Sequence, residues 1–354
     1  MVQIDNALLK QIVDPNVVPK ITLNDGSKIP SIGYGTFGSD HVSAEEVAKA
    51  MQIAILLGYR QLDCARAYRN EAEIGKALEE MLKSGVVRRE DMHITSKLWN
   101  DRHKERDVLV SCAESLRDLR LEYLDLYLVH WPFPNSHTPG CAIDARDPHA
   151  RPFFEDEFMM VWRQMENLVD MGLVRSIGVS NMTRAKLEAV LPAMRIKPVV
   201  NEIEQHPHLQ QKELFSYLHE KNIAIIGHTP LGGPNRPERD RTPDDTNVLA
   251  DPVMVKIAQK HHVHPATIAI KWAVQRGTIP VPFSASPKHI LSNLRCTIED
   301  PLSEEEMREI AEIDQNNRLI KGHVLLWEGA PDWKALWDIH GQIDRTGWND
   351  EKVN

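Results

Sequence analysis

The chain has 354 residues, 42% of them hydrophobic and 26% charged, which excludes a disordered or fibrous protein. This length suits one large barrel with insertions, so we expect a single domain over residues 1–354. The net charge of −9 argues against nucleic-acid partners, and no apolar run is long enough to span a membrane. The four cysteines are scattered, without a C-x-x-C pair or zinc spacing. We expect reduced thiols, no membrane association and a cytoplasmic location.

The first structural signal is a β-hairpin over residues 21–30, where two short alternating runs flank Asp25-Gly26. Eight short apolar runs then predict strands, and most are followed by segments with helical periodicity. The expected strands cover residues 32–36, 60–64, 93–97, 124–130, 175–180, 199–202, 223–229 and 279–283.

Local sequence signals mark both ends of the helix expected over residues 43–57. Ser43 and Glu46 form a capping box, and Gly58 is a typical helix-ending residue. Ser303, with Glu306 three residues later, begins another helix in the same manner. Similar periodicity predicts helices over residues 70–82, 104–119, 157–171, 183–191 and 210–221.

Eight strands that alternate with helices indicate an α/β fold of the (β/α)8 TIM barrel type, with its core over about residues 21–317. The alternative, an open doubly wound sheet, requires a G-x-G-x-x-G turn that leads from the first strand into a helix. Residues 33–38 match that spacing but lead into polar residues, which favours the barrel.

Two segments depart from the repeat. Residues 132–156 form a long loop after the fourth strand, and long loops at barrel strand exits usually shape a pocket. The C-terminal tail, residues 318–354, contains half of the eight tryptophans. We expect this tail to be either a lid over the substrate or an arm packed on the barrel wall.

Polar side chains follow the carboxyl ends of neighbouring strands, where barrel side chains converge. Asp63, Lys97 and His130 end the second, third and fourth strands, and Tyr68 lies just after Asp63. A nearby ammonium lowers the pKa of a phenol towards a range useful for proton transfer. A carboxylate holds that ammonium, and a neutral imidazole can donate to a carbonyl oxygen. The four residues therefore predict a proton-donating site.

Six motifs carry a resemblance to a known family: LDCARAYRNE (62–71), ITSKLW (94–99), LDLYLVHWP (124–132), IGVSN (177–181), NEIEQHPHL (201–209) and TPLGGP (229–234). In order and spacing they resemble the aldo-keto reductase superfamily, in particular its aldose and xylose reductase-like branch. The resemblance implies an NAD(P)H-dependent enzyme that reduces an aldehyde or ketone to the alcohol. It implies Tyr68 as general acid, Asp63, Lys97 and His130 as its catalytic partners, and no metal.

The same resemblance implies the ligand-binding residues. Those expected to bind the nicotinamide cofactor are Thr36, Phe37, Asp63, Ser180, Asn181, Glu202, His228, Thr229, Leu231, Gly233, Phe283, Ser284, His289 and Asn293. Those expected to contact the substrate are Phe37, Tyr68, His130, Trp131 and Trp327. The character of residues 318–333 is similar to that of sugar and polyol reductases, so a polyhydroxylated carbonyl is the expected substrate class.

The chain departs from the family pattern at the cofactor site. Glu202 replaces a usual glutamine, and His228 replaces a tyrosine that stacks on the nicotinamide. Phe283 and His289 stand where many members have a lysine and an arginine for the adenosine 2′-phosphate, and Asn235 stands where an acidic residue often clasps that lysine. NADPH, the family default, is therefore in competition with NADH, and we expect NADP or NAD as cofactor.

Two other functions remain open from the sequence. One is a non-catalytic subunit that binds a nicotinamide cofactor for regulation. The other is a hydrolase that uses Asp63 and Glu202 as paired carboxylates, which explains neither Tyr68 nor Lys97. The family default also suggests a monomer, with a dimer as the alternative.

Overall fold

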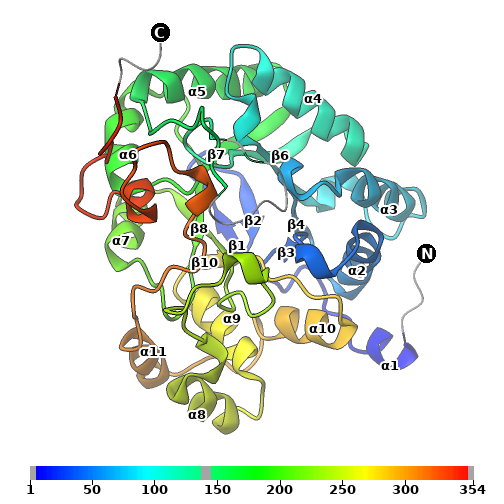
Figure 1. The fold of residues 1–354 in the computed structure, drawn as a ribbon. Helices are drawn as coiled ribbons and strands as arrows, with labels where there is room; N and C mark the ends of the chain where they lie inside the picture. Colours follow the sequence, from blue (N-terminus) through cyan, green and yellow to red (C-terminus); the bar gives the residue numbers. More distant parts are fainter. Residues whose placement is uncertain (1–4, 136, 138–144, 350–354) are drawn as a thin grey trace.

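A computed structural model describes residues 5–135, 137 and 145–349. Eight parallel strands form one sheet whose order follows the chain from the first strand to the last. Helices surround these strands (Figure 1). The strands are β3 (Tyr34–Gly35), β4 (Gln61–Asp63), β5 (His93–Leu98), β6 (Leu124–Val129), β7 (Val174–Ser180), β8 (Val200–Glu204), β9 (Ala224–His228) and β10 (Thr278–Pro280).

The first and last strands are joined by backbone hydrogen bonds. The N–H groups of Gly33 and Gly35 donate to the carbonyl oxygens of Pro280 and Pro282 over 3.0 and 3.1 Å. A Cβ at Gly35 would lie 2.5 Å from the carbonyl oxygen of Val281, so this approach requires glycine. Gly33 and Gly35 therefore serve barrel closure, and the expected (β/α)8 architecture is confirmed.

The predicted hairpin is also present, as β1 (Lys20–Thr22) paired antiparallel with β2 (Lys28–Pro30). Gly26 adopts a φ of 85° in its turn, as the Asp25-Gly26 pair suggested. Ile29 is fully buried and belongs to the cluster of apolar side chains that includes Leu126 and Ile279 of the barrel strands. The hairpin thus packs against the barrel core.

The helices follow the predicted order, with some different boundaries. The capping boxes at Ser43 and Ser303 are both present. The helix expected from residue 104 begins three residues later, because Arg106 has a left-handed φ of 68°. The helices are α1 (Asn6–Leu9), α2 (Ala44–Leu57), α3 (Glu71–Lys83), α4 (Asp107–Leu119), α5 (Glu155–Asp170), α6 (Arg184–Val190), α7 (Lys212–Glu220), α8 (Pro252–Lys260), α9 (Pro265–Gln275), α10 (Pro287–Arg295) and α11 (Glu304–Ala311).

Four helices and one strand end differ more clearly from the expectation. The predicted ranges did not include α1, α8, α9 or α10. The sixth barrel strand, β8, continues two residues beyond Glu202 to Glu204. The long loop after β6 is shorter than expected because α5 already begins at Glu155, while residues 136 and 138–144 of this loop lie outside the described residues.

The tail returns across the barrel wall and packs on it. Trp327 and Trp337 are buried, and the indole N–H of Trp337 donates to the carbonyl oxygen of Lys321 over 2.9 Å. Lys186 of α6 forms a buried ion pair with Asp338 of the tail. In the described part of the chain, no helix combines the length and the apolar character needed to cross a membrane. Cys64, Cys112 and Cys296 are free thiols, whereas Cys141 lies outside the described residues.

Candidate active site

Three of the four predicted catalytic residues form one connected group inside the barrel mouth. The ammonium Nζ of Lys97, on β5, lies 2.7 and 2.8 Å from the carboxylate oxygens of Asp63, which ends β4. It also donates to the Tyr68 hydroxyl over 3.4 Å. Lys97 and Asp63 are buried, and Tyr68 is partly exposed. The burial of the pair fixes the ammonium beneath the phenol.

The electrostatics of Tyr68 differ from the expectation. Burial raises the pKa of the phenol, and the negative charges of Asp63 and Glu202 add to this effect. Lys97 lowers that pKa, as predicted, but does not overcome the other contributions in the protein without ligands. The Tyr68 hydroxyl therefore stays protonated around neutral pH, as a proton donor must. Removal of Lys97 would raise its pKa further.

His130 follows β6 and completes the predicted group of four. Its ring centroid lies 6.0 Å from that of Tyr68, edge to face. Burial lowers the pKa of the imidazole well below its usual value, and the charge of Lys97 adds to the shift. The ring is therefore neutral, and one of its nitrogens can donate a hydrogen bond. The structure brings all four predicted residues together at one end of the barrel.

Aromatic side chains form the wall beside this group. Phe37 is 47% exposed, and its ring centroid lies 5.1 Å from that of Tyr68. Trp99 packs edge to face on His130 at 5.1 Å and was not among the predicted site residues. Its position, two residues after Lys97 at the end of β5, is the signal that could have identified it. The exposed aromatic face makes this wall suitable for an organic substrate.

The residues expected to hold the nicotinamide ring lie on the neighbouring strands. Ser180 ends β7 and is buried together with Asn181, whose amide donates to the carbonyl oxygen of His130 over 3.0 Å. Nε2 of His228, at the end of β9, lies 3.4 Å from the Asn181 side-chain oxygen. Burial lowers the pKa of His228 to about 4, so this imidazole is neutral. Thr36 is buried and its hydroxyl donates to the carbonyl oxygen of Asp63.

Glu202, also predicted to bind the cofactor, approaches the ammonium of Lys97. Its Oε1 atom is 3.4 Å from Nζ of Lys97, and its Oε2 atom is buried and receives no hydrogen bond from a described donor. Burial raises the pKa of this carboxyl, and the negative charge of Asp63 raises it further. One ammonium thus faces two buried carboxyl groups.

The loop after β9 contains Thr229, Leu231 and Gly233, three residues predicted to contact the cofactor. Thr229 and Gly233 have left-handed φ angles of 54° and 52°. The loop continues to Asp245, whose carboxylate binds Arg236 of the same loop. Lys321 of the tail is buried and lies 3.1 Å from the other Asp245 oxygen, so the tail holds this loop in place.

The predicted adenosine-side residues lie in the loop after β10 and on α10. Phe283 is partly buried, with its ring centroid 6.0 Å from that of Tyr34, and the Tyr34 hydroxyl donates to the carbonyl oxygen of Ser284. His289 is exposed, whereas Asn293 is buried. The nearby cation of Arg295 is held by the carboxylate of Glu299, with N–O distances of 2.9 and 3.0 Å.

Two residues predicted to contact the substrate pack with the tail. Trp131 is 7% exposed, and its ring centroid lies 5.5 Å from that of Trp337. Trp327 is 1% exposed, and its indole N–H donates to the carbonyl oxygen of Thr346 over 3.1 Å. Trp131 therefore contacts the tail, and Trp327 is buried in the main apolar core with its indole N–H bound to the tail.

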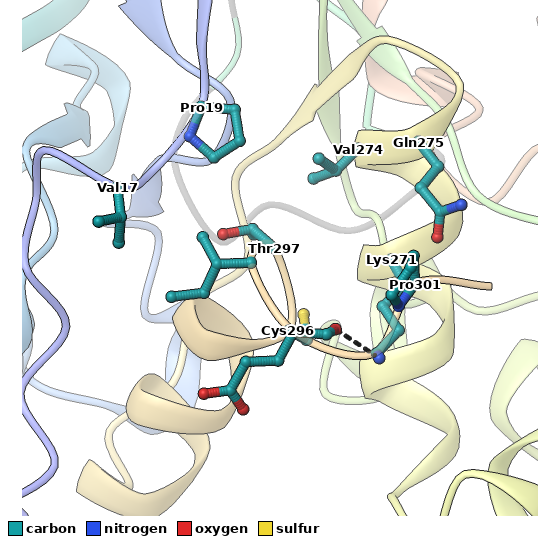
Figure 2. A pocket seen from close by; sticks show the side chains of 10 residues that line it. Val17, Pro19, Lys271, Val274, Gln275, Cys296, Thr297 and Pro301 are labelled. Carbon is teal, nitrogen blue, oxygen red and sulfur yellow. Dashed lines mark hydrogen bonds between the residues drawn. The ribbon is translucent and has the colours of Figure 1, made fainter.

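A separate hollow of about 480 Å³ lies on the outside of the barrel, between α9 and the segment that contains Val17 and Pro19 (Figure 2). None of the four predicted catalytic residues, Asp63, Tyr68, Lys97 and His130, lines this hollow. Its buried cation, Lys271, already donates to the carbonyl oxygen of Glu299 over 2.9 Å. The hollow is lined by Val17, Pro19, Lys271, Val274, Gln275, Cys296, Thr297, Ile298, Glu299 and Pro301.

Comparisons with known proteins agree with this arrangement. The model of the aldo/keto reductase family matches residues 31–315. An aldo/keto reductase of Synechocystis is 39% identical over 91% of this chain and 97% of its own length, and an aldo-keto reductase family 1 member A1-A of Danio rerio is 40% identical over 90% and 97%. The crystal structure of a Bombyx mori aldo-keto reductase in complex with NADP has a TM-score of 0.75 and 32% identity, covering 87% of this chain and 95% of that one. The chain belongs to the aldo/keto reductase family.

Proposed function

We propose that this protein reduces an aldehyde or ketone to the alcohol with a reduced nicotinamide cofactor, and that Tyr68 is the general acid. The observation that carries this proposal is the buried Asp63–Lys97 pair, whose ammonium lies 3.4 Å from the Tyr68 hydroxyl. Family membership and the Bombyx mori relative in complex with NADP support it. Neither a purely structural ion pair nor a paired-carboxylate hydrolase requires a phenol at that position.

The residues around the mouth fit a nicotinamide cofactor. The ring and its carboxamide require polar partners beside an uncharged face, which Ser180, Asn181 and the neutral His228 provide. The buried Oε2 atom of Glu202 lacks a donor among the described residues, as a partner of the carboxamide group would. When bound, the reduced cofactor supplies a hydride to the carbonyl carbon.

The protein contributes the proton and the orientation of the substrate. The neutral His130 imidazole donates a hydrogen bond to the substrate oxygen, which aligns the carbonyl group with Tyr68. As negative charge develops on that oxygen, the Tyr68 hydroxyl gives up its proton. The ammonium of Lys97 stabilises the phenolate that remains, and Asp63 keeps this ammonium charged and in place.

The aromatic wall suggests the class of substrate. Indole rings stack on the C–H faces of sugars as well as on aromatic groups, and Trp99 is partly exposed beside His130. We therefore extend the proposal to polyhydroxylated carbonyls such as sugar aldehydes. A comparison of kcat/KM for sugar aldehydes and for aliphatic aldehydes of similar size tests this extension, and Trp99→Ala should reduce the value for the sugars more.

The reaction itself is tested by following the absorbance of NADPH and NADH with a panel of aldehydes and ketones. We expect carbonyl-dependent oxidation of the cofactor. Cofactor binding without turnover of any carbonyl would favour the non-catalytic regulatory subunit. Hydrolysis of glycosides or esters without cofactor would favour the use of Asp63 and Glu202 as a hydrolytic pair. Either result would overturn the proposal.

A further inference from the structure

Glu202 and Asp63 share a single buried cation. Lys97 Nζ lies 2.7 Å from Asp63 and 3.4 Å from Glu202, and all three side chains are at most 3% exposed. With both carboxyl groups ionised, this cluster would carry one uncompensated negative charge away from water, which is strongly unfavourable. With one of them protonated, the cluster is neutral.

The geometry indicates which carboxyl group carries the proton. Asp63 accepts two hydrogen bonds from Lys97, so its ionised form is well satisfied. The Oε2 atom of Glu202 is buried and receives no hydrogen bond from a described donor, so an ionised Glu202 would leave this oxygen unsatisfied. As a neutral acid, Glu202 can donate its proton to the Asp63 carboxylate, with which it is in hydrogen-bond contact.

We propose that Glu202 is a neutral carboxylic acid in the free protein, and that its ionisation sets the preference between the oxidised and the reduced nicotinamide cofactor. This inference rests on the proposed function. The hydride and the proton reach adjacent atoms of one carbonyl group, so the nicotinamide ring must lie close to the Tyr68 hydroxyl. The ammonium of Lys97 contacts both groups: it lies 3.4 Å from Glu202 and 3.4 Å from the Tyr68 hydroxyl.

The charge of the nicotinamide ring couples the ionisation of Glu202 to the oxidation state of the bound cofactor. The oxidised nicotinamide ring is positively charged, whereas the reduced ring is neutral. An ionised Glu202 would therefore stabilise the oxidised cofactor, and the oxidised cofactor would in turn favour ionisation of Glu202. Binding of the oxidised cofactor near neutral pH should release a proton that binding of the reduced cofactor does not release.

Glu204, the other carboxyl group of β8, does not produce the same response. Glu204, two residues further along β8, accepts hydrogen bonds from the backbone N–H groups of Leu319 and Ile320, and its pKa lies at about 2. It is therefore ionised throughout the neutral range. The groups that face this region from the other elements are Asp63 on β4, Tyr68 after β4, Lys97 on β5, His130 after β6 and His228 on β9.

Calorimetric titration with NADP⁺ and NADPH in two buffers of different ionisation enthalpy measures the protons exchanged on binding. The 2′-phosphate contributes equally to both titrations, so the difference between them isolates the ring. We expect wild-type protein to release up to about one extra proton with NADP⁺. The ratio of the NADP⁺ and NADPH affinities should change about tenfold in favour of NADP⁺ between about pH 6 and about pH 9.

Glu202→Gln preserves the size and polarity of the side chain and cannot ionise, so it should abolish both effects while leaving the melting temperature within a few degrees. Glu204→Gln, the matched control on the same strand, should retain both. A Glu202→Gln protein that still shows the extra proton, or a wild-type protein that shows none, would overturn the inference. If neither cofactor binds to wild-type protein, the proposed function itself is wrong.

Infrared spectroscopy tests the protonation state without any cofactor. The free wild-type protein should show the C=O stretch of a buried carboxylic acid near neutral pH, and this band should be lost as the pH rises. The Glu202→Gln protein should lack it. If the band is absent from wild-type protein, or persists in the variant, Glu202 is not the neutral acid.

Discussion

The ammonium of Lys186 and the carboxylate of Asp338 form an ion pair that joins α6 to the tail across 152 residues of sequence. Both side chains are at most 2% exposed, and Lys186 also donates to the carbonyl oxygen of Leu336 over 2.9 Å. Loss of one partner leaves a buried charge without compensation. We therefore expect this buried contact to hold the tail against α6, which favours a packing arm over a mobile lid.

Lys186→Met alone should lower the free energy of unfolding by about 3–5 kcal/mol, the usual cost of leaving one member of a buried pair unpaired. The double variant Lys186→Met with Asp338→Leu should recover much of this loss, because no buried charge remains. Urea denaturation measures the free energy of unfolding of both variants. Arg184→Ala, which breaks an exposed ion pair with Glu188 on the same helix, is the control and should cost no more than about 1 kcal/mol. Equal losses at both sites would show that the tail is not anchored here.

Tyr68→Phe should lower kcat by about 10²–10⁴-fold, because only the transferable proton is lost. Binding of the reduced cofactor, followed by fluorescence titration, should be unchanged. Retention of more than about a tenth of the wild-type kcat would exclude Tyr68 as the general acid. Phe37→Leu alters the ring that packs on Tyr68 without touching the hydroxyl, and should have a much smaller effect on kcat.

Lys97→Met should reduce kcat by a similar factor through the phenol. Lys97 lowers the pKa of Tyr68 against the effects of burial, so its removal leaves the phenol a weaker acid. A general acid acts while it is protonated, so the alkaline limb of any residual pH–rate profile should move to higher pH. The variant also leaves Asp63 without its cation, so thermal unfolding must accompany the kinetics. An unshifted profile in a folded variant would contradict this role.

The order of the strands and the cluster around Lys97 were accessible from the sequence because their signals are local. Each strand is a short apolar run, and Asp63, Lys97 and His130 stand where such runs end. The direction of the pKa shift of Tyr68 was not accessible from the sequence. It depends on burial and on how closely Glu202 approaches Lys97 from across the barrel. The anchoring of the tail depends on a contact between residues far apart in sequence, for which no local pattern exists.

The carboxylate of Glu204 should contribute to stability in a pH-dependent manner. Burial alone would raise its pKa, but a hydrogen bond with His206 and the nearby Arg318 bring it down to about 2. Since the carboxyl of an unfolded chain titrates near pH 4.3, this contribution is complete above that pH and is lost as the pH falls towards 2. The shift corresponds to about 3 kcal/mol.

Glu204→Gln should therefore destabilise the protein at neutral pH and flatten the fall in stability between about pH 4 and about pH 2. Urea denaturation at a series of pH values checks this. Glu304→Gln, a change at a carboxylate that is 96% exposed, should leave the curve unchanged. A Glu204→Gln curve parallel to that of wild type would show that the carboxylate titrates normally in the folded protein.

The choice between NADPH and NADH should depend on two positions beside the adenosine. A charge-assisted hydrogen bond is worth about 1.5–3 kcal/mol, or about 10- to 150-fold in affinity. Phe283 packs against Tyr34 and carries no charge, and His289 is exposed on α10. Arg295, a further cation of α10, is already held by Glu299 and Gln11. We therefore predict measurable turnover with both cofactors.

Phe283→Lys together with His289→Arg should increase the NADPH preference, measured as the ratio of kcat/KM for NADPH and NADH, by about 10- to 150-fold. Arg295→Met is the control: because its guanidinium binds Glu299, its removal should leave this ratio unchanged. A wild-type preference for NADPH above about a thousandfold, or ~4 kcal/mol, would mean that another cation binds the 2′-phosphate. In that case Lys288, exposed on the same helix, would be the next residue to replace, because it is the lysine of α10 and Arg295 is already paired with Glu299.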